Sequence, residues 1–282
     1  MTIFTLSELY VYPIKSAAGI ALSEAQMTVH GLQYDRRWMV VDAQGKFITQ
    51  RRFPRMALIS VRIGEQLEIN APGMAELSVP LVSEPGEFVK VEVWGDACEA
   101  IALPHTKAWF SQFLDIPCQL VYMPDSSNRP TAHGKLGEDK LVSFADAYPY
   151  LLISEASLSE LNQRLTEKGG ETVTMSRFRP NLVIGGVETA HEEDSWTQIK
   201  IGEVIFDLPK LCDRCSIPNV NPKTGDRGKE PTRTLATYRA WDRGIWFGQN
   251  AIAQLDSSEQ TLRVGDTLEV LARKDSGRSP RD

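Results

Sequence analysis

The stretch LPKLCDRCSIPNVNP, residues 208–222, holds the residues whose spacing points most directly to chemistry. Cys212 and Cys215 form a C-x-x-C pair, a spacing found in zinc sites, in thiol redox centres and beside single reactive thiolates. Structural zinc and iron–sulfur clusters need four ligands. Cys98 and Cys118 form no second such pair, and the four histidines lack the H-x3–5-H spacing. The sequence therefore argues against both kinds of metal centre.

The residues that follow Cys215 also argue against a thioredoxin-type redox pair. Such a pair places its first cysteine at the N-terminus of a helix, which lowers the thiol pKa. The segment after this pair disfavours a helix, since it contains Pro218, Asn219, Asn221 and Pro222. A single reactive or metal-bound thiolate is the interpretation that remains. The flanking Lys210 and Arg214 would favour its ionised form.

The charge around the cysteine pair differs from that of the whole chain. The chain has 282 residues and a formal net charge of −6, which argues against a nucleic-acid-binding protein. Between Pro209 and Arg239, however, seven basic residues stand against three acidic ones, a local net charge of +4. This segment is either a solvated basic face or a site for a small anionic ligand.

Four further motifs place cations and small polar groups beside predicted turns at strand ends. They are YPIKS with Lys15 and Ser16, YDRRW with Arg36 and Arg37, TQRRFPR with Arg51, Arg52 and Arg55, and RFRPN with Arg179 and Asn181. Arginine forks, a lysine ammonium and a hydroxyl suit a phosphate or a polar heterocycle. Any one of these arginines alone fits a surface role, but their repeated position favours a shared site for such a ligand.

Alternating hydrophobicity and β-branched residues predict that strands position these groups. We expect strands at 3–12, 26–30, 36–42, 57–63, 66–70, 90–94, 98–102, 118–123, 181–185, 197–201, 203–207, 245–253 and 261–271. Gly202 and Gly265 indicate hairpin turns. Helices are expected only at 107–114, at 154–170 with a capping box of Ser157 and Glu160, and at 232–239. Many short strands with few helices predict a mainly β (α+β) protein with a barrel or sandwich core.

The length allows one large domain or two packed domains. The polar segment 124–140 is either a linker between two halves or a long functional loop, and residues 272–282 are expected to fray into solvent. There is no run of eighteen apolar residues and no secretory signal at the N-terminus, so we expect a cytoplasmic protein without a membrane partner. Four scattered cysteines do not indicate a disulfide framework.

Six motifs in this order resemble those of a known family. They are LYVYPIKS, GLQYDRRWMVVD, SFADAYPYLLISEASLSELNQRL, RFRPNLVIGG, EDSWTQIKIG, and CDRCSIPNVNPKTGD followed by KEPTRTLATYR. The sequence resembles MOSC-domain proteins (molybdenum cofactor sulfurase C-terminal domain), above all the bacterial YcbX-like proteins and the mitochondrial amidoxime-reducing component. The resemblance covers about residues 3–272. It implies an N-terminal MOSC-associated β domain at 1–123, a β-barrel MOSC domain at 124–272 and a flexible tail at 273–282.

The resemblance also implies a bound molybdenum cofactor, a phosphorylated pterin whose dithiolene holds the metal. By motif position the metal-binding thiolate is Cys215, and Cys212 is not a ligand. The resemblance places five residues at the pterin and its phosphate: Lys15, Ser16, Arg36, Arg179 and Asn181. It places Asp146 near the metal, as a proton donor or a water-positioning group. Ala147 and Tyr148 stand where the mitochondrial relatives carry small hydroxyl residues, so contacts there differ.

The implied activity is a detoxifying reduction of N-oxygenated compounds such as amidoximes, N-hydroxylamines and N-hydroxylated bases. The chain lacks the cysteine-rich ferredoxin-type extension of many YcbX-like proteins, so we expect a separate electron-transfer protein of ferredoxin or cytochrome type. One alternative is a carrier that holds the cofactor, or a persulfide, on Cys215 without turnover. Another is a thiol-based interaction or redox module without a cofactor. Pyridoxal phosphate is not expected, because nothing singles out Lys15 or Lys210 as a Schiff-base lysine.

Overall fold

The computed structural model describes residues 3–82, 86–131, 140–255 and 260–274. The strands up to residue 122 are β1 Phe4–Val11, β2 Ile20–Leu22, β3 Glu24–Thr28, β4 Gly31–Leu32, β5 Trp38–Asp42, β6 Ser60–Ile63, β7 Gln66–Asn70, β8 Leu77–Pro80, β9 Phe88–Val93, β10 Asp96–Leu103 and β11 Cys118–Tyr122. Those after it are β12 Tyr150–Ser154, β13 Leu182–Gly185, β14 Trp196–Ile201, β15 Val204–Asp213, β16 Ala240–Trp241, β17 Gly244–Gln254, β18 Thr261–Arg263 and β19 Thr267–Arg273. The α-helices of the described residues are α1 Lys107–Leu114, α2 Glu155–Glu167 and α3 Thr232–Leu235.

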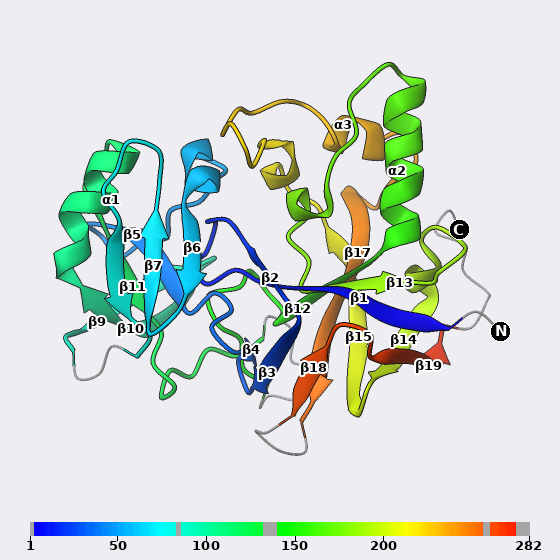
Figure 1. Cartoon of the computed structure of the whole chain (residues 1–282), viewed down its shortest axis with the longest axis horizontal. Helices are drawn as coiled ribbons and strands as arrows, with labels where there is room; N and C mark the ends of the chain where they lie inside the picture. The colour runs from blue at the N-terminus through cyan, green and yellow to red at the C-terminus, as the bar shows by residue number, and fades with distance from the viewer. Residues whose placement is uncertain (1–2, 83–85, 132–139, 256–259, 275–282) are drawn as a thin grey trace.

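Seven strands form a closed barrel, on the right in Figure 1. The pairing order is β12, β13, β1, β19, β14, β15 and β17, and β17 pairs back onto β12. Closure leaves no free strand edge within this ring. Its interior contains Leu6, Trp196, Ile199 and Phe206, each fully buried. The expected mainly β fold with a barrel core is confirmed.

A second lobe, on the left in Figure 1, is built from β5 to β11 and α1. It contains the antiparallel sheet β5-β11-β10-β9 and the smaller sheet β6-β7-β8. The helix α1 covers the lobe with Trp109, Phe110 and Phe113, which the 3.6-residue period places on one face. It ends at Asp115, whose backbone is left-handed with φ 56°. The expected helix 107–114 is confirmed.

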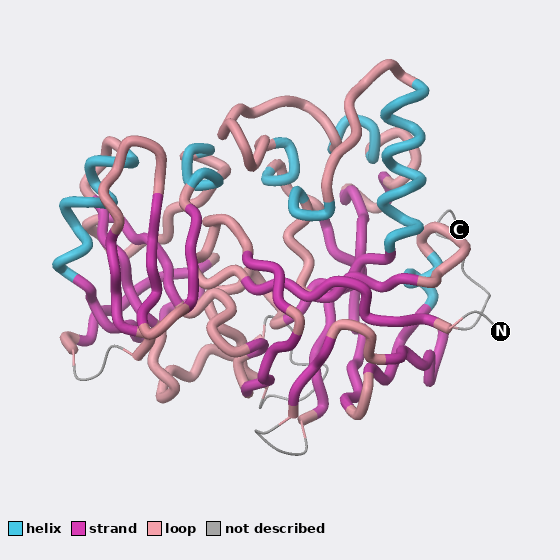
Figure 2. The backbone as a smooth tube through the Cα atoms, in the orientation of Figure 1, coloured by secondary structure: helices cyan, strands magenta, loops and turns pink. Residues whose placement is uncertain are grey.

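The first strand connects the barrel to the other lobe. Although β1 lies at the N-terminus, it pairs with β13 and β19 inside the barrel, and the chain then continues into β5. Figure 2 shows strands on both sides of this connection and loops between them. The division expected at residue 123 remains a prediction, and residues 132–139 of the expected 124–140 loop lie outside the described residues. No helix in the described ranges is long and apolar enough to cross a membrane.

Two helix boundaries differ from those expected. The helix α2 begins after Ser154, whose side chain accepts a hydrogen bond from the N–H of Ser157, so the expected capping box at Ser157 is wrong. The Ser157 hydroxyl instead donates to the buried carboxylate of Glu193 at 2.7 Å. The helix α3 covers only Thr232–Leu235 of the expected 232–239, because the following residues turn into β16.

The strand β15 is longer than the sequence predicts, and this matters for the site. The expected strand 203–207 continues through Pro209 to Asp213, with a register shift between Asp207 and Lys210 that accommodates the proline. Cys212 therefore lies within the end of a barrel strand. The turn at Gly202 joins the hairpin β14–β15 as expected. Gly265 separates β18 from β19, which pair with different strands, so no hairpin forms there.

The C-terminal segment is paired where the structure describes it. Strand β19 continues to Arg273, and the N–H of Lys274 donates to the carbonyl of Ser195 at 2.7 Å. Arg273 also forms an ion pair with Glu192 at 2.8 Å. Residues 272–274 therefore do not fray as expected, and residues 275–282 lie outside the described residues.

Candidate functional site

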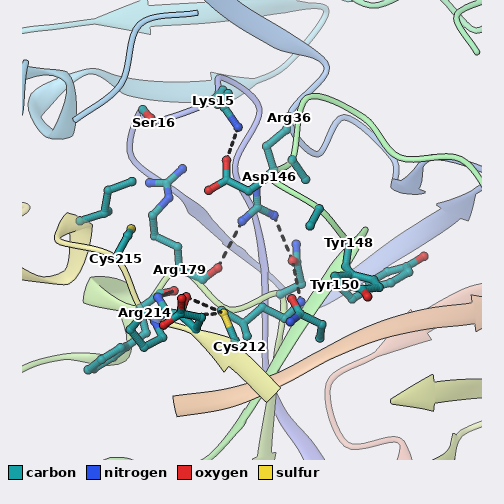
Figure 3. A pocket seen from close by; sticks show the side chains of 18 of the residues that line it. Lys15, Ser16, Arg36, Asp146, Tyr148, Tyr150, Arg179, Cys212, Arg214 and Cys215 are labelled. Atoms are coloured by element: carbon teal, nitrogen blue, oxygen red, sulfur yellow. Dashed lines mark hydrogen bonds and ion pairs between the residues drawn. The ribbon is translucent and has the colours of Figure 1, made fainter. Parts of the chain in front are cut away.

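A cavity of about 260 Å³ lies where the barrel meets the connection to the second lobe; we call it the central cavity. All seven sequence-predicted site residues line it: Lys15, Ser16, Arg36, Asp146, Arg179, Asn181 and Cys215. Figure 3 labels all of them except Asn181. They come from the segment after β1, from the residues before β5, β12 and β13, and from the residues after β15. Motifs far apart in sequence are thus brought together as predicted.

Backbone pairing between the end of β1 and the start of β5 sets the first two motifs side by side. The N–H of Lys15 donates to the carbonyl of Trp38 at 2.8 Å, and the N–H of Arg36 donates to the carbonyl of Tyr12 at 2.9 Å. The Tyr12 N–H in turn donates to the buried carboxylate of Asp35 at 2.8 Å. These bonds fix the directions in which the Lys15 and Arg36 side chains leave the backbone.

Three of the predicted site residues have left-handed backbone. Ser16 has φ 67°, Arg36 has φ 48° and Arg179 has φ 58°. This region disfavours residues with a Cβ by about 1–2 kcal/mol each, and it persists only where surrounding contacts hold it. Such strain concentrates at functional sites. Its occurrence at three residues of one cavity supports a binding role for these positions.

Asp146 holds two cations at the mouth of the central cavity. Its Oδ1 lies 2.5 Å from Nζ of Lys15, and its Oδ2 lies 3.1 Å from Nη2 of Arg51. Burial alone would raise the pKa of Asp146, but Lys15 and Arg51 outweigh this effect and hold the pKa well below its usual range. Since 49% of the Asp146 side chain is exposed, solvent screens part of this attraction. Asp146 is therefore a carboxylate at neutral pH.

Lys15 is almost fully buried, and its ammonium donates to Asp146 and to the carbonyl of Phe144 at 2.6 Å. Burial lowers the pKa of Lys15 to about 8, although Asp146 acts in the opposite direction. Lys15 is thus a cation whose proton is exchangeable close to neutral pH. The ion pair holds the Lys15 ammonium against the carboxylate of Asp146 in the central cavity.

Two arginines of the site pack on the ring of Tyr12. The guanidinium carbon of Arg36 lies 4.5 Å from the ring centroid, and that of Arg179 lies 4.2 Å from it. Arg36 is further fixed by Asn181, whose Oδ1 accepts a hydrogen bond from Nη1 at 2.9 Å, and by the carbonyl of Arg179. Asn181 therefore acts on the cavity by positioning Arg36.

Arg179 leaves part of its buried guanidinium without a partner in the protein. Its Nη1 donates to the carbonyl of Ala17, whereas its buried Nη2 has no hydrogen-bond partner among the described residues. Burial and the neighbouring Arg36 lower the pKa of Arg179 to about 10. A desolvated guanidinium with a free donor is suited to a phosphate or carboxylate oxygen. The geometry thus fits an anionic ligand at this end of the cavity.

The two cysteines have different surroundings. Sγ of Cys212 accepts a hydrogen bond from Nη1 of Arg214 at 3.1 Å, and burial nevertheless raises the Cys212 pKa. Cys215 lies beyond the strand and interacts with the guanidinium of Arg51, which also holds Asp146. The arginine expected to favour a thiolate therefore contacts Cys212, and Cys215 is paired with a cation from the other lobe. Only a single 3-10 turn, Ile217–Asn219, follows the pair.

The basic segment 209–239 contributes to the cavity only in part. Lys210 and Arg214 line it. Arg227 instead donates to the backbone carbonyls of Gln50 and Arg51, and so holds the Arg51 loop in place. The remaining basic residues, Lys223, Lys229, Arg233 and Arg239, are either exposed or, for Arg239, paired with Asp194 at 2.5 Å. The described lining as a whole includes six cationic and two acidic residues.

Two supporting residues were missed by the sequence analysis. Arg129 is buried, and its guanidinium donates to the carbonyls of Ser143, Ala145 and Asp146, which fixes the loop that carries Asp146. Trp94 donates its indole N–H to Asp146 from the second lobe. Trp94 ends the expected strand 90–94 and Arg129 lies in the expected loop 124–140, and neither pattern indicated a role at the site.

The structure therefore defines a mainly β protein with a cation-lined cavity, which two cysteine thiols, the carboxylate of Asp146 and an arginine with an unused buried donor also line. Residues 3–117 match the MOSC N-terminal beta barrel domain and residues 139–269 match the MOSC domain. The chain is 35% identical to mitochondrial amidoxime-reducing component 1 of Mus musculus, over 95% of this chain and 83% of the relative, and 33% identical to that of Homo sapiens with the same coverage. It is 32% identical to molybdenum cofactor sulfurase of Oryza sativa subsp. japonica, over 86% of this chain and 32% of that protein. The chain belongs to the MOSC-domain family.

Proposed function

We propose that the chain binds the molybdenum cofactor in the central cavity and reduces N-oxygenated compounds, with electrons from a separate transfer protein. The observation that carries the proposal is the unpaired buried donor of Arg179, set in a cavity that also presents the thiol of Cys215. A phosphorylated pterin with a bound metal needs both an anion site and a soft ligand. The names of the relatives, which concern amidoxime reduction and the molybdenum cofactor, support the same assignment.

In this proposal the residues of the cavity divide the ligand between them. Arg179, Arg36 and the hydroxyl of Ser16 would hold the phosphate and pterin, and Cys215 would hold the metal through its thiolate. Within the described residues no group of three or more His, Cys, Asp and Glu side chains could hold a metal ion alone. A metal that brings its own dithiolene ligands needs only one protein thiolate, so this donor set fits the cofactor.

When bound, the molybdenum cofactor supplies the two-electron chemistry of the reaction. An amidoxime then takes up two electrons and two protons, its N–O bond breaks, and an amidine and water leave. The electrons come from a ferredoxin- or cytochrome-type protein. The chain itself must bind and orient the N–OH group and supply protons.

Asp146 and Lys15 are the groups suited to those tasks. As a carboxylate, Asp146 accepts hydrogen bonds, so it orients a water molecule or the substrate N–OH group rather than donating a proton. Lys15 lies 2.5 Å away, and its pKa of about 8 allows it to give up and regain a proton near neutral pH. Arg51 keeps Asp146 ionised and contacts Cys215, so it links the two ends of the reacting region.

A carrier function is the second proposal, and the similarity to molybdenum cofactor sulfurase favours it. In that case Cys215 bears a persulfide, or the protein holds the cofactor without reducing a substrate. The mass of the intact protein identifies the persulfide form, because a persulfide adds one sulfur atom that thiol reductants remove.

The test uses protein produced in a host that makes the cofactor. Molybdenum and pterin are quantified, and reduction of benzamidoxime is followed with an artificial electron donor. We expect close to one molybdenum per chain and turnover that depends on the donor. Protein without molybdenum but with a labile sulfur on Cys215 supports the carrier instead. Full molybdenum without any reduction of N-oxygenated compounds excludes the proposed reaction.

A further inference from the structure

A second and larger cavity, of about 480 Å³, adjoins the central cavity. Thr49 and Arg51 line both cavities, so the two meet at the guanidinium that holds Asp146. The walls of the second cavity come from the end of β5, the segment 43–53, the β9–β10 turn and residues 116–117. All of them belong to the second lobe. We call it the aromatic cavity, after the side chains of Phe47, Phe53 and Trp94 that line it.

Trp94 is the residue that joins the aromatic cavity to the site. It lies at the tip of the β9–β10 hairpin, it is 52% exposed, and its backbone is left-handed with φ 56°. A bulky residue with positive φ is uncommon and needs contacts that hold it in place. The indole N–H bonds Asp146, and the guanidinium carbon of Arg51 lies 4.4 Å from the centroid of the ring. Phe47 packs 5.1 Å from the same ring.

The charges around the aromatic cavity favour an anion. Its described lining contains the cations Lys46, Arg51 and Arg52 and a single carboxylate, Asp42. Asp42 is already used, because its Oδ1 accepts hydrogen bonds from the backbone N–H groups of Gln44 and Lys46. Arg51 is likewise bound to Asp146. Lys46 and Arg52 therefore remain as the cations that face a ligand in this cavity.

We infer that the aromatic cavity recognises the body of the substrate, and that it selects planar aromatic N-oxygenated compounds that carry a negatively charged group. The inference rests on the proposed function. The N–OH end would pass Thr49 and Arg51 to reach Asp146, the ring would stack on Trp94 and Phe47, and the charge would lie toward Lys46 or Arg52. Aromatic stacking tolerates many rings, so this recognition selects a class of compounds and not one molecule.

A purely structural role for Trp94, as a cap on Asp146, predicts different behaviour. A cap would affect every substrate alike and would act on kcat. A recognition residue changes KM, and it does so most for substrates that present a ring. The two roles of the indole are separable, because phenylalanine retains an aromatic ring but removes the N–H that bonds Asp146.

The experiment compares three substrates, acetamidoxime, benzamidoxime and 4-carboxybenzamidoxime, with the molybdenum-loaded protein. In the wild-type protein we expect KM to fall in that order. The Trp94→Ala variant should raise KM for the two aromatic substrates by roughly threefold to tenfold, and less for acetamidoxime. Trp94→Phe should keep KM within about twofold and show its change in kcat. Arg52→Gln should raise KM mainly for the carboxylated substrate.

Phe88→Ala is the matched control. Phe88 is an exposed aromatic residue at the start of the same hairpin, and it is not among the residues that line the cavity. It should leave all three KM values unchanged. Equal KM values for Trp94→Ala and Phe88→Ala, in an active wild-type protein, overturn the inference and leave the proposed function standing. A wild-type protein that reduces none of the three substrates counts against the proposed function.

A binding measurement tests recognition in the aromatic cavity separately from the proposed reaction. Titration of the purified protein with 4-carboxybenzamidoxime should quench tryptophan fluorescence, and Trp94→Phe should remove most of that quenching. Quenching that is retained in Trp94→Phe places the ligand elsewhere and contradicts the inference. Because this readout needs no turnover, it tests the cavity even if the reaction differs from the one proposed.

Discussion

Nζ of Lys15 lies 2.5 Å from Oδ1 of Asp146, an ion pair between the segment after the first barrel strand and the loop before β12. The lysine is almost fully buried and the carboxylate is half exposed. The same carboxylate binds Arg51 and the indole of Trp94, both from the second lobe. Asp146 thus joins a cation that follows the first barrel strand to the second lobe, and Arg51 links it to the thiol of Cys215.

The burial of Lys15 in this ion pair should make the stability of the protein depend on pH. Burial lowers the pKa of Lys15 from 10.5 in the unfolded chain to about 8, so between these values the unfolded state binds more protons than the folded state. The Lys15 contribution to the free energy of unfolding therefore rises with pH across this window, by at most about 1.4 kcal/mol per pH unit. Urea unfolding of the wild-type protein and of Lys15→Met, at several pH values from 7.5 to 10, measures it. The advantage of the wild-type protein over Lys15→Met should grow with pH. A constant difference contradicts the burial argument.

Substitution of Arg129 should cause a large loss of stability. Its buried guanidinium binds three successive parts of the loop that carries Asp146, and it forms an ion pair with Asp96 at 3.2 Å. Arg129→Met should lower the free energy of unfolding by about 3 kcal/mol, because several buried carbonyls lose their donor. The control is Arg62→Met, an exposed arginine in the second lobe, which should change it by less than about 0.5 kcal/mol. Similar urea midpoints for the two variants count against a supporting role for Arg129.

Substitution of Gly19 by alanine should create a steric clash with the ring on which Arg36 and Arg179 pack. A Cβ at this position would lie 2.4 Å from Cε1 of Tyr12, the buried ring on which Arg36 and Arg179 pack. Gly19→Ala should therefore cost about 1–3 kcal/mol of stability and weaken binding of the anionic ligand. At Gly64, by contrast, the nearest atom to such a Cβ is 3.5 Å away. Thermal unfolding of Gly64→Ala should match the wild-type protein, and an equal loss in both variants would show that crowding at Tyr12 is not the cause.

The Ser16→Gly substitution should have opposite effects on stability and on ligand binding. Its left-handed backbone, with φ 67°, favours glycine, so Ser16→Gly should stabilise the chain by up to about 1 kcal/mol. Ser16→Ala retains the strain and should not stabilise it. Both variants lose the hydroxyl and should retain less pterin after dialysis than the wild-type protein. Full pterin retention in Ser16→Ala would remove Ser16 from the binding site.

Local sequence patterns were sufficient for the fold class, for α1 and for most strands. They failed where a distant residue decided the outcome. Ser154 and Ser157 both suit a helix N-cap, and the buried carboxylate of the distant Glu193 accepts hydrogen bonds from both hydroxyls, while Ser154 caps the helix. Pro209 ended the expected strand, but pairing of β15 with β17 resumes at Lys210 after a register shift. Neither effect is visible in a local window of sequence.

In the candidate site, too, local sequence motifs were informative and contacts between distant residues were not visible in them. The seven residues that the family motifs single out all line the central cavity. The motifs did not show that Arg214 contacts Cys212, or that Arg51 contacts Cys215 and Asp146. Trp94 was not singled out, since the alternation that predicted the strand 90–94 says nothing of a partner 52 residues along the chain. Contacts between lobes had to come from the structure.

The molybdenum content of two single-cysteine variants tests whether Cys215 is the metal-binding thiolate. Cys215→Ala and Cys212→Ala are produced beside the wild-type protein in a host that makes the cofactor, and molybdenum per chain is measured after dialysis. The account predicts that Cys215→Ala loses molybdenum, and that Cys212→Ala, whose sulfur is held by Arg214, retains it. A Cys215→Ala protein with full molybdenum, or loss of the metal only in Cys212→Ala, would contradict the assignment of Cys215 as the metal-binding thiolate.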